Sequence, residues 1–107
     1  MQGTIKMKKR LLNYQEELIN SLHDPEEAQA YLNAALMDED PRIFLLALKN
    51  VLEAQGDNIA IVAQKTQLNR ENLYRMLSKK GNPKLTSIIS VLNTLGLHLA
   101  VQADKIK

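Results

Sequence analysis

The stretch IAIVAQKTQLNRENLYRMLS, residues 59–78, decides how the fold of this chain is interpreted. It contains two short runs with helical spacing, 59–65 and 70–78, separated by a break of a few residues. The small residue Ala63 stands where a second helix would cross the first, and Leu68 can anchor the turn between them. This arrangement is typical of a helix-turn-helix, in which two helices pack at a steep angle across a turn of roughly three to four residues.

The apolar side chains of this stretch fall on one side of each helix. They are expected to face the core and are Ile59, Val62, Leu73, Met76 and Leu77. Asn69 precedes the second run and is a favourable capping residue for it. Gln67 departs from the usual pattern, because the turn favours a positive φ, which costs a residue other than Gly about 1 kcal/mol.

The outward side of residues 70–78 carries the side-chain types that read base edges. Arg pairs bidentately with guanine, Glu accepts from cytosine N4, and Asn reads adenine. Because a recognition helix contacts bases chiefly with its N-terminal residues, we expect base contacts from Arg70, Glu71 and Arg75. Contacts to phosphates position a protein without specifying sequence. These are expected from Asn69, Tyr74, Lys79, Lys80, Asn82 and Lys84.

The charge of the chain is unevenly distributed behind a net charge of +2. Residues 64–84 hold six basic residues against one acidic residue, a net +5, and residues 1–13 add +4. Residues 14–55 hold nine acidic residues against two basic ones, a net −7. A basic block of this kind is typical of a nucleic-acid surface, although the charge pattern alone also fits a solvated face.

The rest of the chain predicts more helices. Residues 14–23 show helical spacing, and Asp24 followed by Pro25 has the chemistry of a helix start, as does Asp40 followed by Pro41. The helix after Pro41 is apolar almost all round and is expected to be the buried central helix, ending at Gly56. A last helix is expected over residues 84–95, with Leu85, Ile88, Ile89, Leu92 and Leu95 on one face.

The two ends of the chain are expected to differ from its centre. Residues 1–13 lack periodicity and are expected to form a basic flexible arm. Residues 97–101 alternate with period two and predict one short strand, whose partner could be the same strand of a second copy. The prediction is therefore an all-α fold of five to six helices in a single domain, residues 14–107, with an N-terminal helical extension and one C-terminal strand.

Several classes of function are disfavoured by composition. The chain has no cysteine, which excludes disulfides, thiolate zinc sites and cysteine nucleophiles, and favours a cytoplasmic location. No apolar run approaches the roughly 20 residues of a membrane span. His23 and His98 are isolated, and the acids at 38–40 precede a helix start, where negative charge is favourable. We therefore expect no enzyme, no catalytic residue, no cofactor and no metal.

The run of residues 68–78, followed by 79–83 and 95–97, resembles the HigA-type antidote proteins of bacterial addiction modules, as do residues 24–28 and 31–36. The resemblance covers about residues 14–102 and implies a lambda-repressor-like helix-turn-helix regulator of transcription. It further implies an antitoxin that represses its own operon and binds a toxin, typically a small ribosome-dependent endoribonuclease. The positions that match the family's recognition helix are Arg70, Glu71, Tyr74 and Arg75, whereas no residue is assigned to toxin binding.

Alternatives to the autorepressing antitoxin stay open. One is a stand-alone regulator with the same DNA contacts and no toxin. Another is a protein-interaction module whose acidic residues 14–55 dock a basic partner. A homodimer is expected in the DNA-binding cases, because one helix-turn-helix reads few base pairs and two-fold dimers on paired half-sites are common. Leu97, Leu99 and Val101 offer it an apolar interface, and the alternative is that this strand packs back onto its own core.

Overall fold

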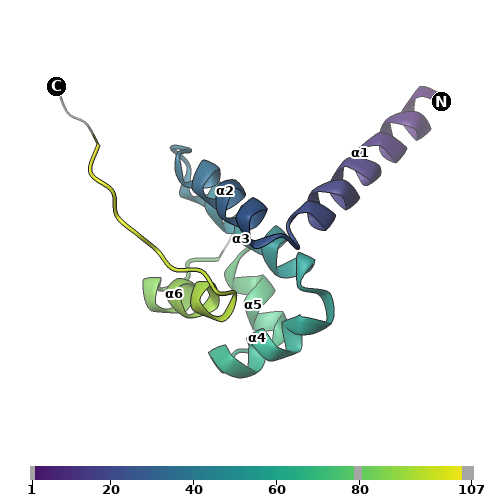
Figure 1. The fold of residues 1–107 in the computed structure, drawn as a ribbon. Coiled ribbons are helices and arrows are strands. Elements are labelled where there is room, and N and C mark those ends of the chain that lie inside the picture. Colours follow the sequence, from purple (N-terminus) through teal and green to yellow (C-terminus); the bar gives the residue numbers. More distant parts are fainter. Residues whose placement is uncertain (1, 79–80, 105–107) are drawn as a thin grey trace.

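The computed structural model describes residues 2–78 and 81–104, which form six α-helices, one short 3-10 helix and loops. In chain order these are α1 (Gln2–Ser21), α2 (Pro25–Leu36), α3 (Pro41–Ala54), η1 (Gly56–Asn58), α4 (Ile59–Thr66), α5 (Arg70–Met76) and α6 (Leu85–Thr94) (Figure 1). The predicted all-helical character is confirmed for the described residues. None of their helices has the length and apolar character needed to cross a membrane.

The predicted helix starts at two aspartates are confirmed. The Asp24 carboxylate accepts a hydrogen bond of 2.9 Å from the Glu26 backbone N–H, and Pro25 occupies the first turn of α2. Asp40 caps α3 in the same way, accepting from the Arg42 backbone N–H at 3.0 Å. Each carboxylate satisfies a donor that the first helical turn would otherwise leave unpaired.

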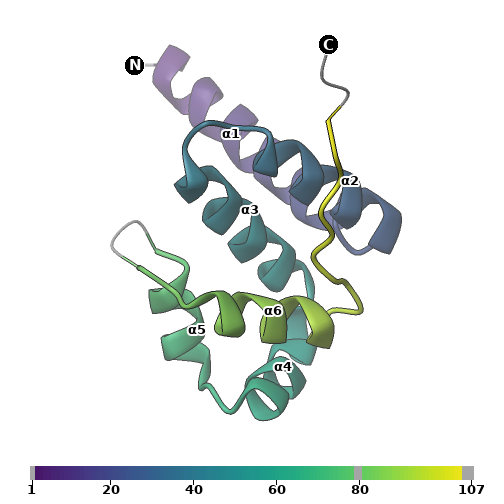
Figure 2. The same ribbon diagram turned by 90° about the vertical axis from the view of Figure 1, so that its left-hand side faces the viewer.

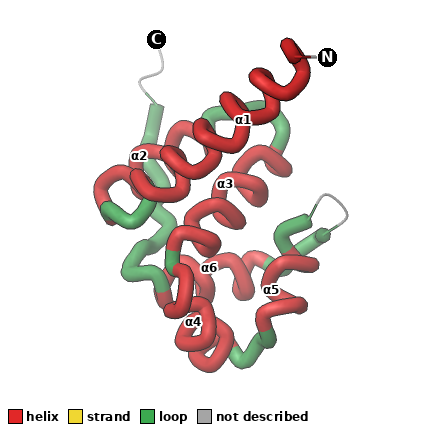
Figure 3. The backbone as a smooth tube through the Cα atoms, turned by 90° about the vertical axis from the view of Figure 1, so that its right-hand side faces the viewer, coloured by secondary structure: helices red, strands yellow, loops and turns green. Residues whose placement is uncertain are grey.

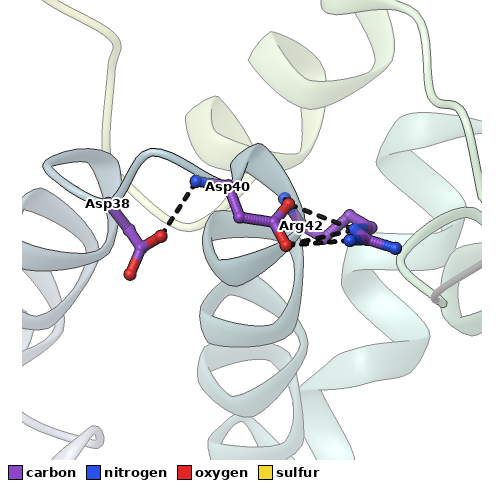
Figure 4. Close-up of polar contacts among 3 residues, drawn as sticks. All are labelled: Asp38, Asp40 and Arg42. Carbon is purple, nitrogen blue, oxygen red and sulfur yellow. Dashed lines mark hydrogen bonds and ion pairs between the residues drawn. The ribbon is translucent and has the colours of Figure 1, made fainter.

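The start of α3 is reinforced by a small polar cluster (Figure 4). The Arg42 guanidinium donates to the Asp40 carboxylate at 3.0–3.2 Å, and the Asp38 carboxylate accepts from the Asp40 backbone N–H at 2.8 Å. Hydrogen bonds from the Arg42 side chain are the main reason that the pKa of Asp40 lies below its ordinary value. The cap at Asp40 is therefore an ionised carboxylate at neutral pH.

Helix α3 is the centre of the core, as predicted. Figures 2 and 3 show it between α1 and α2 on one side and α4, α5 and α6 on the other. Its buried apolar side chains pack with those of α2 and α6, and the cluster includes Phe44, Ala47, Leu48, Val51, Leu52, Ala28, Leu32, Ile88, Val91 and Leu92. Burial is not complete around the helix, because Ile43 is 40% exposed and Leu46 is 52% exposed.

One buried polar residue ties the three N-terminal helices together. Asn50 of α3 donates through Nδ2 to the Tyr31 hydroxyl of α2 at 2.8 Å. Its Oδ1 accepts from Nε2 of Gln15 in α1 at 3.3 Å. A buried amide is costly unless it is hydrogen-bonded, so these contacts fix the relative placement of α1, α2 and α3.

The secondary structure predicted for the N-terminal residues was wrong. Helix α1 begins at Gln2 rather than near Tyr14, so residues 2–13 continue the helix instead of forming an irregular arm. Its first turns project away from the other helices (Figure 1). The physical reason is local, because the Lys, Arg, Leu and Met residues of this segment all have high helix propensity.

The strand predicted at residues 97–101 is absent, and no residue among 2–78 and 81–104 forms a strand. The Leu97 backbone N–H instead donates to the Leu92 carbonyl at 2.8 Å, and Gly96 has a φ of 79°. This is a helix end closed by a left-handed glycine. Beyond it the chain continues as a single extended segment (Figure 1), and none of the described residues forms a neighbouring strand that would complete a ladder.

Candidate nucleic-acid interface

Helices α4 and α5 are joined by three residues, 67–69, as the sequence pattern requires. Gln67 adopts the left-handed conformation, with φ 59° and ψ 26°, which confirms the unusual position predicted for it. The backbone N–H of Leu68 donates to the Ala63 carbonyl at 3.0 Å. These features terminate α4 and turn the chain sharply into α5.

Asn69 caps α5 as predicted. Its backbone is extended, with φ −81° and ψ 169°, and its Oδ1 accepts from the Asn72 backbone N–H at 2.7 Å. The cap uses the oxygen of the side-chain amide, which leaves the nitrogen available to a ligand at the N-terminal end of α5. One residue can therefore both start the helix and contact a phosphate.

The helix pair is anchored by the inner residues that the sequence pattern identified. Ile59, Val62, Leu73 and Leu77 are buried, whereas Ala63, Leu68 and Met76 pack against the core with partial exposure. Helix α4 also lies against α6, whose Val91 and Leu92 belong to the same cluster. The position of α5 is thus set by the core.

The outer face of α5 is polar and charged. Arg70, Glu71 and Arg75 are exposed, and so is Asn72. Within the part of the chain that the structure describes, none of these charged groups takes part in an ion pair. Their donors and acceptors are consequently available to an external partner.

Tyr74 differs from its neighbours because it is half-buried. The guanidinium carbon of Arg70 lies 5.8 Å from the centroid of its ring. This contact was not predicted from the sequence, although side chains four residues apart on a helix are neighbours. The spacing of Arg70 and Tyr74 was the available signal.

The turn after α5 continues the polar surface. Asn82 and Lys84 are exposed, and Lys84 occupies the position before the first residue of α6. The Gly81 backbone N–H donates to the Ser78 carbonyl at 2.9 Å, which holds the turn against the end of α5. Lys79 and Lys80, which were also expected to contact phosphates, lie outside the described residues.

The histidines do not contribute to this surface. His23 is exposed, and its Nδ1 lies 3.1 Å from the Asn20 carbonyl oxygen, whereas His98 is exposed in the C-terminal segment. Among residues 2–78 and 81–104, no group of His, Cys, Asp and Glu side chains is arranged to hold a metal ion. The side chains exposed on α5 are charged or amide groups that can form hydrogen bonds.

Comparison with known proteins identifies the family. The model of a family described as "probable addiction module antidote protein" matches residues 13–103. An uncharacterized protein of Haemophilus influenzae is 32% identical over 89 residues, which are 83% of this chain and 90% of that relative. No solved structure matches the chain significantly. The chain belongs to the family of probable addiction module antidote proteins.

Proposed function

We propose that this antidote-family protein is an antitoxin that binds double-stranded DNA through a lambda-repressor-like helix-turn-helix, formed by α4 and α5, and represses its own operon. The observation that carries the proposal is the outer face of α5. Arg70, Glu71 and Arg75 are exposed there without ion-pair partners in the described chain, on a helix fixed by the Asn69 cap and the buried Leu73. Base readout requires free polar groups of this kind on a rigid helix.

The surroundings of α5 fit the phosphate backbone. Exposed Asn69 immediately precedes the helix, and exposed Asn82 and Lys84 follow it. Residues 64–84 carry a net charge of +5, to which Lys79 and Lys80 contribute. Phosphate contacts of this type release counterions, so binding would weaken steeply with salt.

The partner that the family implies is a cognate toxin. We propose that the toxin binds the acidic part of the chain, residues 14–55, which is distinct in sequence and charge from the proposed DNA-binding helices. Such a division would allow one cytoplasmic protein to hold DNA and toxin together. A neighbouring reading frame for a small basic protein would support this proposal, and its absence would favour a stand-alone regulator.

We also propose that the protein acts as a homodimer through an apolar surface. Leu36 and Leu99 both line two hollows of about 600 and 640 Å³, one of which also includes Leu85 and the other Met37. Met37 is 85% exposed and Leu85 is 65% exposed, and nearby Val101 is fully exposed. A second copy placed here would cover these side chains and offer a partner strand to residues 97–101.

The dimer proposal predicts that Leu99→Asp combined with Val101→Asp yields monomers, because buried carboxylates would oppose an apolar interface. Mass measurement by light scattering during gel filtration is the check. Asn93→Asp, at an exposed position of α6 that lines neither hollow, adds a carboxylate outside the proposed interface and should remain dimeric. An unchanged mass for the double variant would contradict the proposed surface.

The DNA proposal predicts different effects for base and phosphate contacts. Arg70→Ala should weaken binding to specific DNA by about 1–3 kcal/mol. Lys84→Ala should weaken binding to all sequences alike and lower the salt slope by about one. Mobility-shift titrations with the DNA upstream of the protein's own start codon, against random DNA of equal length, measure both. Equal affinity for the two DNAs, unaltered by Arg70→Ala, would exclude specific binding.

A further inference from the structure

We infer that Tyr74 is a positioning residue for Arg70, whose guanidinium it holds ready to pair with a guanine edge. This inference rests on the proposed DNA-binding function and adds to it a determinant of specificity. The sequence pattern alone assigns Tyr74 only a contact to a phosphate. The structure adds a contact within the protein. The Tyr74 ring lies beside Arg70, the first residue of α5, which is one helical turn before it.

The geometry places the two side chains within interaction range. The guanidinium carbon lies 5.8 Å from the centroid of the tyrosine ring, inside the limit of about 6 Å for a cation–π contact. The ring is half-buried, whereas Arg70 is exposed. In the described chain, Arg70 has no ion-pair partner. The adjacent Glu71 points elsewhere, because neighbouring residues do not face each other on a helix. Of the contacts in the described chain, the one to the Tyr74 ring is therefore the one that can restrain the Arg70 guanidinium.

A ring is a suitable restraint for a base-reading arginine. Free arginine side chains carry about 2 kcal/mol of rotamer entropy, part of which is lost when both ends of the fork must meet one guanine. A carboxylate partner would restrain the group but occupy its N–H donors. An aromatic ring attracts the cation through its π-electrons and leaves those donors for O6 and N7 of guanine. Tyr74 thus lowers the ordering cost of binding without competing with the base.

This role can be separated from two others that Tyr74 might be given, hydrogen bonding to a phosphate through its hydroxyl and direct packing on DNA. Tyr74→Phe keeps the ring and removes the hydroxyl, whereas Tyr74→Leu removes the ring. If the ring acts through Arg70, then Tyr74→Leu matters only while Arg70 is present. A double-mutant cycle measures this dependence directly.

The experiment titrates the full chain and its Tyr74→Phe, Tyr74→Leu, Arg70→Ala and Arg70→Ala/Tyr74→Leu variants with the DNA upstream of its start codon. We expect Tyr74→Leu to weaken specific binding about two- to fivefold, as the strength of an exposed cation–π contact implies. Tyr74→Phe should retain nearly full affinity. In the Arg70→Ala background, Tyr74→Leu should have no further effect.

Two results would overturn the inference. One is an equal loss for Tyr74→Leu with and without Arg70, which would mean that the ring contacts DNA itself. The other is a loss for Tyr74→Phe as large as that for Tyr74→Leu, which would assign the role to the hydroxyl. Thermal unfolding of each variant sets a titration temperature at which all are folded.

A measurement without DNA tests the contact independently of the proposed function. The Arg70 side-chain protons should show an upfield ring-current shift in the NMR spectrum of the free protein, present in Tyr74→Phe and lost in Tyr74→Leu. If this shift is observed but no DNA is bound specifically, the proposed function fails although the contact exists. If DNA is bound specifically and the shift is absent, the positioning role fails alone.

Discussion

Replacing Leu73 by Ala is expected to destabilise the protein by about 2–5 kcal/mol, the range for truncating a buried leucine in a close-packed core. Leu73 is 1% exposed and is the buried residue of α5 itself. Its loss would leave a cavity beneath the helix that carries Arg70, Glu71 and Arg75. Because small domains are stable by only about 5–15 kcal/mol, the loss is a large share of the total.

Chemical denaturation followed by far-UV circular dichroism measures this effect. Ile61→Ala is a matched control, because Ile61 lies on α4 and is 49% exposed. We expect the control to change the free energy of unfolding by about 0.5 kcal/mol or less, as is usual for surface substitutions. Similar unfolding midpoints for the two variants would show that α5 does not depend on Leu73 for its attachment to the core.

The features that the sequence predicted best are those decided by local chemistry. The caps at Asp24, Asp40 and Asn69 follow from side-chain oxygens that reach backbone N–H groups two or three residues ahead. The left-handed conformation of Gln67 follows from the turn geometry that joins two crossing helices. The caps and the turn depend on residues close to them in sequence, so a short stretch of sequence is enough to predict them.

Features that depend on distant residues were harder to predict. In the sequence, nothing distinguishes Asn50 from an exposed polar residue of a helix. In the structure it is buried, with hydrogen bonds to Tyr31 and Gln15 of two other helices. The period-two pattern of residues 97–101 predicted a strand, but a ladder needs a neighbouring strand, and none of the residues that the structure describes forms one. Whether such a segment forms a strand depends on whether another strand is present to pair with it.

The buried face of α6 shows the limit of periodicity within one helix. The pattern placed Leu85 and Ile89 with Ile88 and Leu92, but Leu85 is 65% exposed and Ile89 is 37% exposed. Val91 is fully buried instead. When the apolar face of a helix is wider than the surface it packs against, some of its apolar residues stay exposed. Periodicity alone does not tell which of them these are. The exposed Leu85 contributes to the apolar surface proposed for dimerisation.

The candidate DNA surface was predictable as a set of residue types but not as a geometry. Helical spacing identified Arg70, Glu71 and Arg75 as outward-facing, and the structure places them there. The Arg70–Tyr74 contact depends on rotamers that spacing does not fix. The close approach of Gly81 to the end of α5 depends on the path of the chain after the helix.

Gly81 approaches its neighbours far more closely than Gly56 or Gly96 does. A Cβ atom added there would lie 2.6 Å from the carbonyl carbon of Met76 and 2.8 Å from the carbonyl oxygen of Arg75, and closer still to the Met76 carbonyl oxygen. These neighbours are backbone atoms of α5 and its end, so no flexible side chain can move aside. An alanine at position 81 must displace the turn or the end of the helix.

Gly81→Ala is therefore expected to destabilise the protein near or above the upper end of the roughly 1–3 kcal/mol typical of overpacking. It should also weaken binding to every DNA sequence, because the displaced turn carries the proposed phosphate contacts Asn82 and Lys84. Asn82→Ala is the matched control in the same turn, and its exposed side chain predicts a change in unfolding free energy of about 0.5 kcal/mol or less. Thermal and chemical unfolding, with mobility shifts on random DNA, give both readouts. A Gly81→Ala protein as stable as Asn82→Ala would mean that the turn yields easily and does not fix the surface beside α5.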